Sequence, residues 1–379
     1  MRVFQNLKVD FLAKRKIAYV VSSILLLIGI GSLILRGLEL GIDFKGGSEI
    51  ALEFEKPIDI TEVRDYLNTI GIGNVEVKTF GGESGILVRT ELQEIPSDVY
   101  PRVREAIERE IEKYNPDAQY EVTDTTISSV TYQFATPEIT KSLTSKLFKD
   151  GFQTSEFTQT ADNRRMIVRI GIADWIEENL RERNADNRFT ILKEEQVGPK
   201  VGQELQSDAI IAILLSLVVI LVYLGFRFKF VFAFGAVAAL FHDVLITLGI
   251  FSLLYGVISF LNLEISISVV AAFLTLVGYS INDTVIVFDR IRENLKIHKT
   301  APIEENINKG INQTIPRTII TSLTTLLVVT VLLIFGGEVL RGFAFTLFFG
   351  ILIGTYSSIF VASPIVLEYA KRSKKKITF

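Results

Sequence analysis

Residues Ile265–Phe288 read ISISVVAAFLTLVGYSINDTVIVF, an apolar run that contains one charged side chain, Asp283. Because an α-helix rises about 1.5 Å per residue, about 20 apolar residues cross the ~30 Å hydrocarbon core of a bilayer. The run is therefore long enough to span a membrane. A carboxylate at lipid depth is energetically costly, so its presence indicates either a function or a bonding partner.

Five similar runs occur elsewhere in the chain, and together the six runs contain only two charged residues, Asp243 and Asp283. The six predicted spans are Ile17–Leu35, Ala209–Phe226, Phe230–Tyr255, Ile265–Phe288, Ile319–Phe335 and Phe343–Leu367. We therefore predict an α-helical polytopic membrane protein with six transmembrane helices. A single soluble fold is excluded, even though a hydrophobic content of 49% over 379 residues is an ordinary globular value.

The composition excludes several kinds of chemistry. The sequence has no cysteine and only two histidines, His242 and His298. Disulfides, thiolate nucleophiles, cysteine-ligated zinc and histidine metal clusters are therefore ruled out. No nucleotide-binding loop or nucleophile–base pair is present, so we predict no catalytic residue, no metal and no cofactor. The net charge of −3 gives no overall attraction to nucleic acid.

Basic residues indicate the orientation of the predicted spans. Lys and Arg are concentrated in the N-terminal segment 1–16, in the tail 368–379 and in the loops after the second and fourth spans, whereas 256–264 has none. Short cytoplasmic loops are enriched in Lys and Arg, so we expect both termini to be cytoplasmic and segment 36–208 to be exported. Residues 17–35 are expected to be an uncleaved anchor, because the run is longer than a signal-peptide core and lacks a small-x-small cleavage site.

The exported segment reads as a soluble α+β domain. Alternating apolar residues predict strands, and 3.6-residue periodicity predicts helices. The predicted elements, in chain order, are strands at Ile50–Phe54, Val75–Val77 and Ile86–Val88, helices over Ile60–Leu67 and Val99–Ile111, a helix opening at Thr136-Pro137-Glu138, and a hairpin within Phe152–Ile172. The order strand, helix, strand, strand, helix indicates a ferredoxin-like unit. Nothing in this domain resembles a catalytic constellation, so a binding or lever role is favoured.

The fourth predicted span carries a polar stripe. Tyr279, Asn282 and Asp283 share one helical face with Thr275. Asp283 lies seven residues before Arg290, which places it about 10 Å inside the cytoplasmic end of the span. Such a stripe is consistent either with proton transfer or with hydrogen bonds that only hold the bundle together.

A basic residue enters the fifth span from the same side. Arg317 could reach Asp283, and Thr321 and Thr325 follow it at i+4 and i+8 on the same helical face. These residues predict a water-lined proton path in which protonation of Asp283 loosens its pairing with Arg317 and lets helices shift. The alternative for Arg317 is a simple cytoplasmic anchor.

The second buried carboxylate, Asp243, lies thirteen residues from Phe230, about 20 Å from the cytoplasmic end of its span. Asp243 need not contact Asp283, and a place in the proton path and a structural role are equally open for it. The adjacent His242 either relays protons or, as we favour, only bonds within the bundle.

Several motifs resemble those of one membrane protein family. The motifs are Asp43-Phe44-Lys45-Gly46-Gly47, Val197-Gly198-Pro199-Lys200-Val201-Gly202, Phe241-His242-Asp243, Gly278–Thr284 continuing into Val285–Asn294, and Arg317–Ser322. Together they look like the SecF members of the SecD/SecF family of bacterial protein-export membrane proteins, which is related to the resistance-nodulation-division (RND) transporters. The resemblance covers both ends of the chain and all six predicted spans.

The resemblance implies a function for the chain. Such a protein is expected to pair with SecD and to use the proton motive force to assist preprotein translocation through SecYEG after the SecA ATPase has acted, with YajC as a further partner. It is expected in the bacterial cytoplasmic (inner) membrane, with its large domain in the periplasm. The family's intramembrane Asp and Arg correspond to Asp283 and Arg317, and its motif at the domain entry corresponds to Asp43, Phe44, Gly46 and Gly47.

The expected organisation is a cytoplasmic N-terminus at 1–16, a first transmembrane helix at 17–35, an exported domain at 36–208, a five-helix remainder of an RND-like membrane domain at 209–367 and a basic tail at 368–379. The stretch from about 92 to 188 is longer than the family usually has, and Lys45 and Ser48 stand where Thr is common.

Two other functions remain open. A structural scaffold of the export complex without proton conduction would tolerate Asp283→Asn, because an amide replaces the hydrogen bonds but not the proton. Half of an RND-type exporter of small molecules or lipids is disfavoured, since a self-contained exporter needs twice as many spans.

Overall fold

The computed structural model describes residues 8–126, 128–149, 152–156, 163–258, 261 and 263–372. The chain divides into two compact units. The helical unit comprises Met1–Gly41 and Glu204–Phe379, and the α+β unit comprises Ile42–Gln203. The basic residues at 1–7 and 373–379, on which the predicted cytoplasmic termini partly rest, lie outside the described residues.

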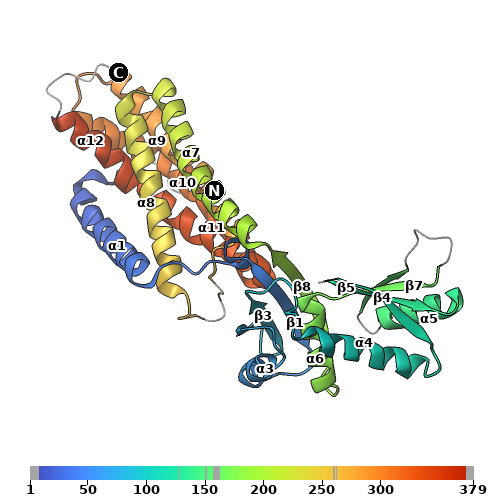
Figure 1. Cartoon of the computed structure of the whole chain (residues 1–379). Coiled ribbons are helices and arrows are strands. Elements are labelled where there is room, and N and C mark those ends of the chain that lie inside the picture. The colour runs from blue at the N-terminus through green and yellow to red at the C-terminus, as the bar shows by residue number, and fades with distance from the viewer. Residues whose placement is uncertain are drawn as a thin grey trace. The chain divides into compact units, whose positions relative to one another are not determined.

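Long helices form the first unit (Figure 1). Their bounds are α1 Arg15–Arg36, α7 Pro199–Arg227, α8 Phe230–Leu254, α9 Ile267–Ile297, α10 Ile303–Phe335 and α11 Gly337–Ser357, followed by a π-helical turn at Ser358–Ala362 and α12 Ser363–Arg372. Within the described residues, six helical segments are long and apolar enough to cross a membrane. The predicted six-span fold class is confirmed.

Several helices extend beyond the apolar runs that predicted them. Helix α9 continues to Ile297, and α10 begins at Ile303, well before the apolar run at Ile319. The added part of α10 contains Gly310 and Pro316, which disfavour helix, but Ile307, Ile311 and Ile315 recur every four residues and are buried, so packing stabilises it. Pro302 is the N-cap of α10. An apolar run therefore marks the lipid-length part of a helix and not the helix ends.

Helices α1 and α8 make close backbone contact. A Cβ atom added to Gly249 would lie 2.4 Å from Gly29 Cα, so Gly249 has no space for a side chain, and one added to Gly29 would lie 3.2 Å from Gly249 Cα. The Ser32 and Ser252 hydroxyls are 2.8 Å apart, and Arg36 Nη1 donates to Leu253 O at 2.9 Å. Small residues allow helices in lipid to approach closely enough for such bonds, so this pair is fixed by packing and by polar contacts.

The α+β unit begins with a four-stranded antiparallel sheet in the order β2-β3-β1-β8. Its strands are β1 Gly47–Phe54, β2 Val75–Thr79, β3 Gly85–Thr90 and β8 Phe189–Val197. Helix α3, Ile60–Leu67, connects β1 to β2, and helix α6, Ile172–Arg183, precedes β8. This strand order and these crossovers are those of a ferredoxin-like unit, as predicted.

A second four-stranded antiparallel sheet, β4-β5-β7-β6, lies within the stretch from about 92 to 188. Its elements are α4 Tyr100–Tyr114, β4 Tyr120–Thr126, β5 Ser129–Phe134, α5 Pro137–Lys149, β6 Gln153–Glu156 and β7 Arg165–Arg169. Strand β6 pairs with β7, as the predicted hairpin requires; of its predicted turn, Ala161-Asp162-Asn163, the first two residues lie outside the described residues. The two sheets share one hydrophobic core.

The glycines at the entry to β1 have a backbone conformation that other residues rarely adopt. Gly46 has φ of +78° and Gly47 has φ of +117°. A Cβ atom on Gly47 would lie 2.3 Å from Thr90 O, and one on Gly46 would lie 2.9 Å from Pro199 Cα. The two glycines therefore let the first strand of the sheet pack against the segment that follows the last strand.

Gly47→Ala is expected to destabilise the α+β unit by about 4 kcal/mol or more, because left-handed strain and a backbone clash act together. Gly82→Ala is the matched control: Gly82 has φ of +155° but no atom within 4 Å of an added Cβ, so it isolates the strain. Thermal unfolding and limited proteolysis of the full chain measure both variants. An equal loss of stability in Gly47→Ala and Gly82→Ala would show that the backbone clash at Gly47 contributes nothing.

A carboxyl group on α6 makes the stability of the α+β unit depend on pH. Burial, reinforced by the negative charge of Glu110, raises the pKa of Glu178 to about 7, against an ordinary value of 4.5. Because the folded-state pKa is the higher one, the stabilising contribution is complete below about pH 4.5 and is lost as the pH rises through about 7.

Raising the pH from 5 to 8 is expected to lower the stability of the unit by on the order of 1–3 kcal/mol. Glu178→Gln is expected to remove most of this pH dependence, whereas Glu105→Gln, which changes an exposed carboxylate of α4, keeps it. Urea midpoints of the full chain at the two pH values test the expectation. The expectation would be refuted if the urea midpoint of Glu178→Gln changed between pH 5 and pH 8 as much as that of the unaltered chain.

Candidate functional site: buried carboxylates in the helical unit

Asp243 on α8 is fully buried, with 0% of its surface exposed. Its Oδ2 accepts hydrogen bonds from the hydroxyls of Ser280 on α9 at 2.7 Å and Ser357 on α11 at 2.8 Å. The other carboxylate oxygen, Oδ1, lies 3.0 Å from His242 Nδ1. A buried carboxylate requires such partners, so Asp243 connects three helices of the bundle.

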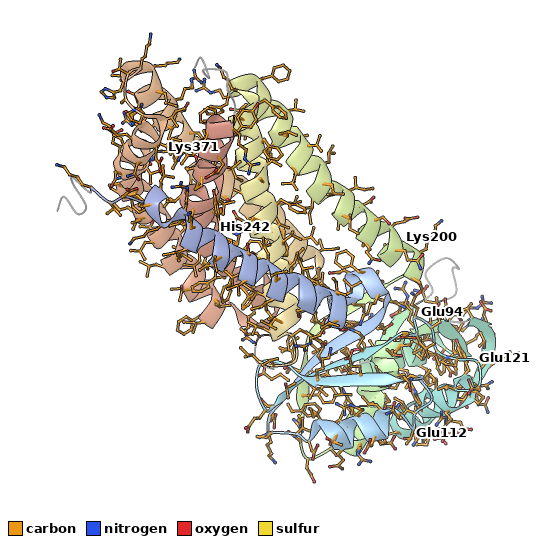
Figure 2. All side chains as sticks on the ribbon, turned by 90° about the vertical axis from the view of Figure 1, so that its left-hand side faces the viewer. Glu94, Glu112, Glu121, Lys200, His242 and Lys371 are labelled. Atoms are coloured by element: carbon orange, nitrogen blue, oxygen red, sulfur yellow. The ribbon has the colours of Figure 1, made fainter. Side chains whose placement is uncertain are left out.

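His242 continues the polar chain toward α1. Its Nε2 lies 3.1 Å from Ser22 Oγ, and Ser22 Oγ lies 3.1 Å from the Tyr356 hydroxyl. Tyr356 in turn donates to Ala18 O at 2.9 Å. Figure 2 labels His242 where α8 lies beside α1. The network therefore runs from Asp243 to the first helix through groups that can each bind or release a proton.

Asp283 on α9 is also buried, with 3% of its surface exposed. Ser322 on α10 donates to its Oδ2 at 3.3 Å, and Thr355 on α11 donates to Ser322 Oγ at 2.7 Å. The two hydroxyls thus form a hydrogen-bonded chain from α11 through α10 that ends on the carboxylate.

The other residues of the predicted stripe divide into two groups. Tyr279 donates to Thr325 Oγ1 at 3.2 Å, which links α9 to α10 as the prediction requires. Thr321 bonds only to the backbone of its own helix, at Arg317 O and Thr318 O. Asn282 is exposed on the surface of the helical unit. The structure therefore brings Tyr279 and Thr325 together and leaves Asn282 and Thr321 outside the contacts of Asp283.

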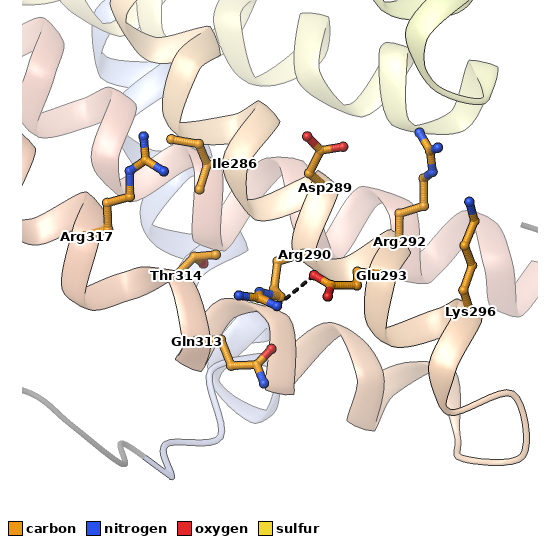
Figure 3. Close-up of a pocket in the computed structure, with 9 residues that line it drawn as sticks. All are labelled: Ile286, Asp289, Arg290, Arg292, Glu293, Lys296, Gln313, Thr314 and Arg317. Atoms are coloured by element: carbon orange, nitrogen blue, oxygen red, sulfur yellow. Dashed lines mark hydrogen bonds and ion pairs between the residues drawn. The ribbon is translucent and has the colours of Figure 1, made fainter.

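Arg317 lies within α10, two residues before the predicted fifth span, and lines a cavity of about 560 Å³ between α9 and α10. Figure 3 shows Arg317 at one end of this cavity and Lys296 at the other. Among the described residues near the cavity, the ion pairs are Arg290–Glu293 and Arg227–Asp289, and none joins Asp283 to Arg317. The predicted pairing of these two residues is thus not made in this conformation.

The hydroxyls of α11 were not predicted as site residues. Thr355, Tyr356 and Ser357 each contact a different part of the polar network. A run of consecutive hydroxyl residues inside a predicted span was a usable signal, but the sequence alone does not show which helices meet there. Within the described residues, no group of three His, Cys, Asp or Glu side chains is placed to hold a metal ion.

The domain-entry motif lies in the α+β unit. Asp43 and Phe44 belong to a short helix, α2 Ile42–Lys45, and Phe44 is buried. A Cβ atom on Gly202 would lie 3.0 Å from Phe44 O, so the entering and leaving segments pack at backbone distance. Residues Asp43, Phe44, Gly46 and Gly47 thus form a structural junction between the first and last strands.

The geometry defines a polytopic membrane protein with ionisable groups buried among its helices. The model of the protein export membrane protein SecD/SecF C-terminal family matches residues 177–372, and that of the SecD/SecF GG motif matches residues 31–58. The protein translocase subunit SecF of Rhodothermus marinus is 43% identical and aligns over 98% of this chain and 97% of its own. The SecF subunit of Calditerrivibrio nitroreducens is 36% identical, over 97% and 95%.

A solved structure gives the same result. The crystal structure of SecDF, a translocon-associated membrane protein from Thermus thermophilus, superposes with a TM-score of 0.69 at 29% identity. The match covers 98% of this chain, which spans 40% of the SecDF chain. This chain belongs to the SecD/SecF family, as one of its SecF translocase subunits. It is a multi-pass membrane protein of transporter type.

Ser280→Ala is expected to lower the stability of the helical unit by about 1.5–3 kcal/mol, because it removes one of the two hydroxyls that bond to Asp243 Oδ2. Combining it with Asp243→Asn should recover part of the loss, since the carboxylate is then absent. Ser216→Ala is the control, because the Ser216 hydroxyl bonds only to Ile213 O of its own helix. Thermal unfolding in detergent is measured for the unaltered chain, Ser280→Ala, Asp243→Asn, their combination and Ser216→Ala. Full additivity would contradict the direct contact.

Proposed function

We propose that this chain works with SecD to couple the proton motive force to preprotein translocation across the bacterial cytoplasmic membrane. The preprotein passes through SecYEG after SecA has acted, and YajC is a further partner. Protons are taken up and released at Asp283, with Arg317 at the cytoplasmic end of the path.

The observation that carries the proposal is the environment of Asp283. The carboxylate is buried at lipid depth, yet two hydroxyls from two other helices lead to it in sequence, Ser322 and then Thr355. A carboxylate kept only for packing could be replaced by a neutral amide at lower cost. A hydroxyl relay supports a group that gains and loses a proton.

The position of Arg317 supports a moving ion pair. Its guanidinium lines a cavity and has no ion-pair partner among the described residues, while Asp283 bonds to hydroxyls instead. Arginine remains charged in proteins, so an approach of Arg317 favours the ionised state of a nearby carboxylate and a retreat favours the protonated state. Pairing and separation of the two residues would then accompany each proton transfer.

The exposed polar surface of α9 and α10 supports a second subunit. Asn282, Thr321 and Thr324 are exposed, and Gly278 has no atom within 4 Å of an added Cβ. Polar side chains in a lipid-length segment face protein more often than lipid. SecD, the fused half of the matched SecDF chain, is the proposed occupant, and the remaining exposed helical surfaces face lipid.

The proposed orientation places both termini in the cytoplasm and the α+β unit in the periplasm, as the distribution of Lys and Arg indicates. The α+β unit then acts as the contact for the translocating chain or for SecD. A structural scaffold without proton conduction is the alternative, and it makes the opposite prediction for substitution of Asp283.

Asp283→Asn and Arg317→Met are expected to abolish the proton-gradient-dependent part of preprotein translocation and to leave the ATP-driven part intact. The amide keeps the shape of the carboxylate but cannot be ionised. Translocation into inverted membrane vesicles containing the matching SecD, with and without an uncoupler, measures the two parts separately.

The matched controls are Asp289→Asn and Arg290→Met, which remove a carboxylate and a guanidinium from the cytoplasmic end of α9. Both controls should translocate like the unaltered chain. Equal membrane levels and equal co-purification of SecD are required for every variant. Retention of the gradient-dependent part by both site variants would instead establish the scaffold.

A further inference from the structure

Three consecutive residues of α11 contact three different helices. Thr355 donates to Ser322 on α10, Tyr356 lies against Ser22 on α1, and Ser357 donates to Asp243 on α8. Successive residues of a helix point about 100° apart, so one turn of α11 can serve three neighbours at once. This turn is the place where the surroundings of Asp243 and of Asp283 meet.

The connection to each carboxylate is short. From Asp283 it runs through Ser322 at 3.3 Å to Thr355 at 2.7 Å. On the other side, Ser357 Oγ lies 2.8 Å from Asp243 Oδ2. Only Tyr356 separates Thr355 from Ser357 in the chain, so a rotation of this turn changes both sets of distances together.

Each of the two hydroxyls has a second acceptor within reach. Thr355 Oγ1 is 2.7 Å from Ser322 Oγ and also 2.7 Å from Ile351 O. Likewise, Ser357 Oγ is 2.8 Å from Asp243 Oδ2 and 3.1 Å from Gly354 O. A hydroxyl has one proton to donate, so it donates mainly to one of its two acceptors at a time. An ionised carboxylate is the stronger acceptor, so the acceptor of Ser357 depends directly on the charge of Asp243. The acceptor of Thr355 depends on the charge of Asp283 through Ser322, which lies between them.

The backbone after this turn departs from the α-helix. Ser358–Ala362 form a π-helical turn, and the Ser363 hydroxyl donates to Ser358 O at 3.0 Å. Pro364 follows, and its nitrogen cannot donate to the carbonyl of Phe360 as an α-helix would require. Single π-helical turns occur frequently at functional sites. Here the turn separates the Thr355–Ser357 segment from α12, so the segment can rotate without carrying α12 along.

We infer that Thr355 and Ser357 are positioning residues that couple proton occupancy at Asp283 to proton occupancy at Asp243. Protonation of Asp243 weakens its bond from Ser357, and protonation of Asp283 weakens its bond from Ser322 and, through Ser322, the bond that Ser322 accepts from Thr355. In either case the α11 hydroxyl turns to the carbonyl of its own helix, α11 rotates, and the hydrogen bonds of the other carboxylate change. The hydroxyl protons stay on their oxygens, and only their acceptors change. This inference rests on the proposed function, in which Asp283 changes its protonation state.

The other titratable and charged groups around the two carboxylates are few. His242 on α8 and, beyond it, Tyr356 on α11 lie on the Asp243 side. Tyr279 on α9 lies one helical turn from Asp283, and Arg317 on α10 acts on Asp283 through its charge. None of these groups bonds to Thr355 or Ser357, so the coupling can be tested through the two hydroxyls alone.

The test is infrared titration of the carboxyl band of Asp283 in the full chain with SecD in nanodiscs, with the band assigned by its loss in Asp283→Asn. Asp243→Asn as the only substitution is expected to displace the pH midpoint of this band by about one pH unit from its value in the unaltered chain, a tenfold change in proton affinity. The displacement should vanish when Asp243→Asn is combined with Thr355→Val or with Ser357→Ala, because each removes one link.

Two variants distinguish positioning from general packing. Thr355→Ser keeps the hydroxyl and should restore the displacement. Thr346→Val removes another buried α11 hydroxyl, one that bonds only to Gly342 O of its own helix, and should leave the displacement unchanged. The inference would be overturned if Asp243→Asn alone left the midpoint unchanged. It would also be overturned if the displacement persisted when Asp243→Asn is combined with Thr355→Val or with Ser357→Ala.

The titration needs no translocation, so it separates this inference from the proposed function. If Asp283→Asn translocates normally while the midpoints are coupled, the proposed function fails and the coupling stands. If Asp283→Asn loses the gradient-dependent part while the midpoints are independent, the proposed function stands and the coupling through α11 fails.

Discussion

The hydrogen bonding of two carboxylates at lipid depth is the constraint on which the helical unit depends. At that depth a carboxylate depends on hydrogen bonds from the protein itself. Asp243 obtains them from α9 and α11, and Asp283 obtains them from α10 and, through one hydroxyl, from α11. The relative placement of these helices follows from this requirement as much as from apolar packing. Helix α11 is central because it supplies hydroxyls to both sites.

The α+β unit is organised by a different constraint. Its first and last strands are neighbours in one sheet, so the chain enters and leaves at adjacent points. The junction is held by glycines, because Gly47 faces Thr90 O and Gly202 faces Phe44 O at distances that exclude a side chain. The motif that resembled a family signature is therefore explained by backbone packing.

The sequence predicted the parts of the structure that depend on local pattern. Apolar runs predicted the six spans, and alternation and periodicity predicted the ferredoxin-like unit, including the helix that begins after Asp59. Burial of Asp243 and Asp283 followed from their positions inside apolar runs. What could not be predicted depends on which helices meet. The bonds of Ser280 and Ser357 to Asp243 join residues 37 and 114 positions away from it, and no local pattern encodes them. The separation of Arg317 from Asp283 is likewise a property of one conformation and not of residue type.

The contact between α1 and α8 has a consequence for how the protein is made. Ser22 meets His242, Gly29 meets Gly249 and Ser32 meets Ser252, each 220 residues apart in the chain. The constant offset means that the two helices run in the same direction with a fixed register. During synthesis, α1 is made before α8. The small and polar residues of α1 that contact α8 therefore lack these partners while the entire α+β unit and α7 are translated. The contacts between α1 and α8 thus form late, although α1 is made long before α8.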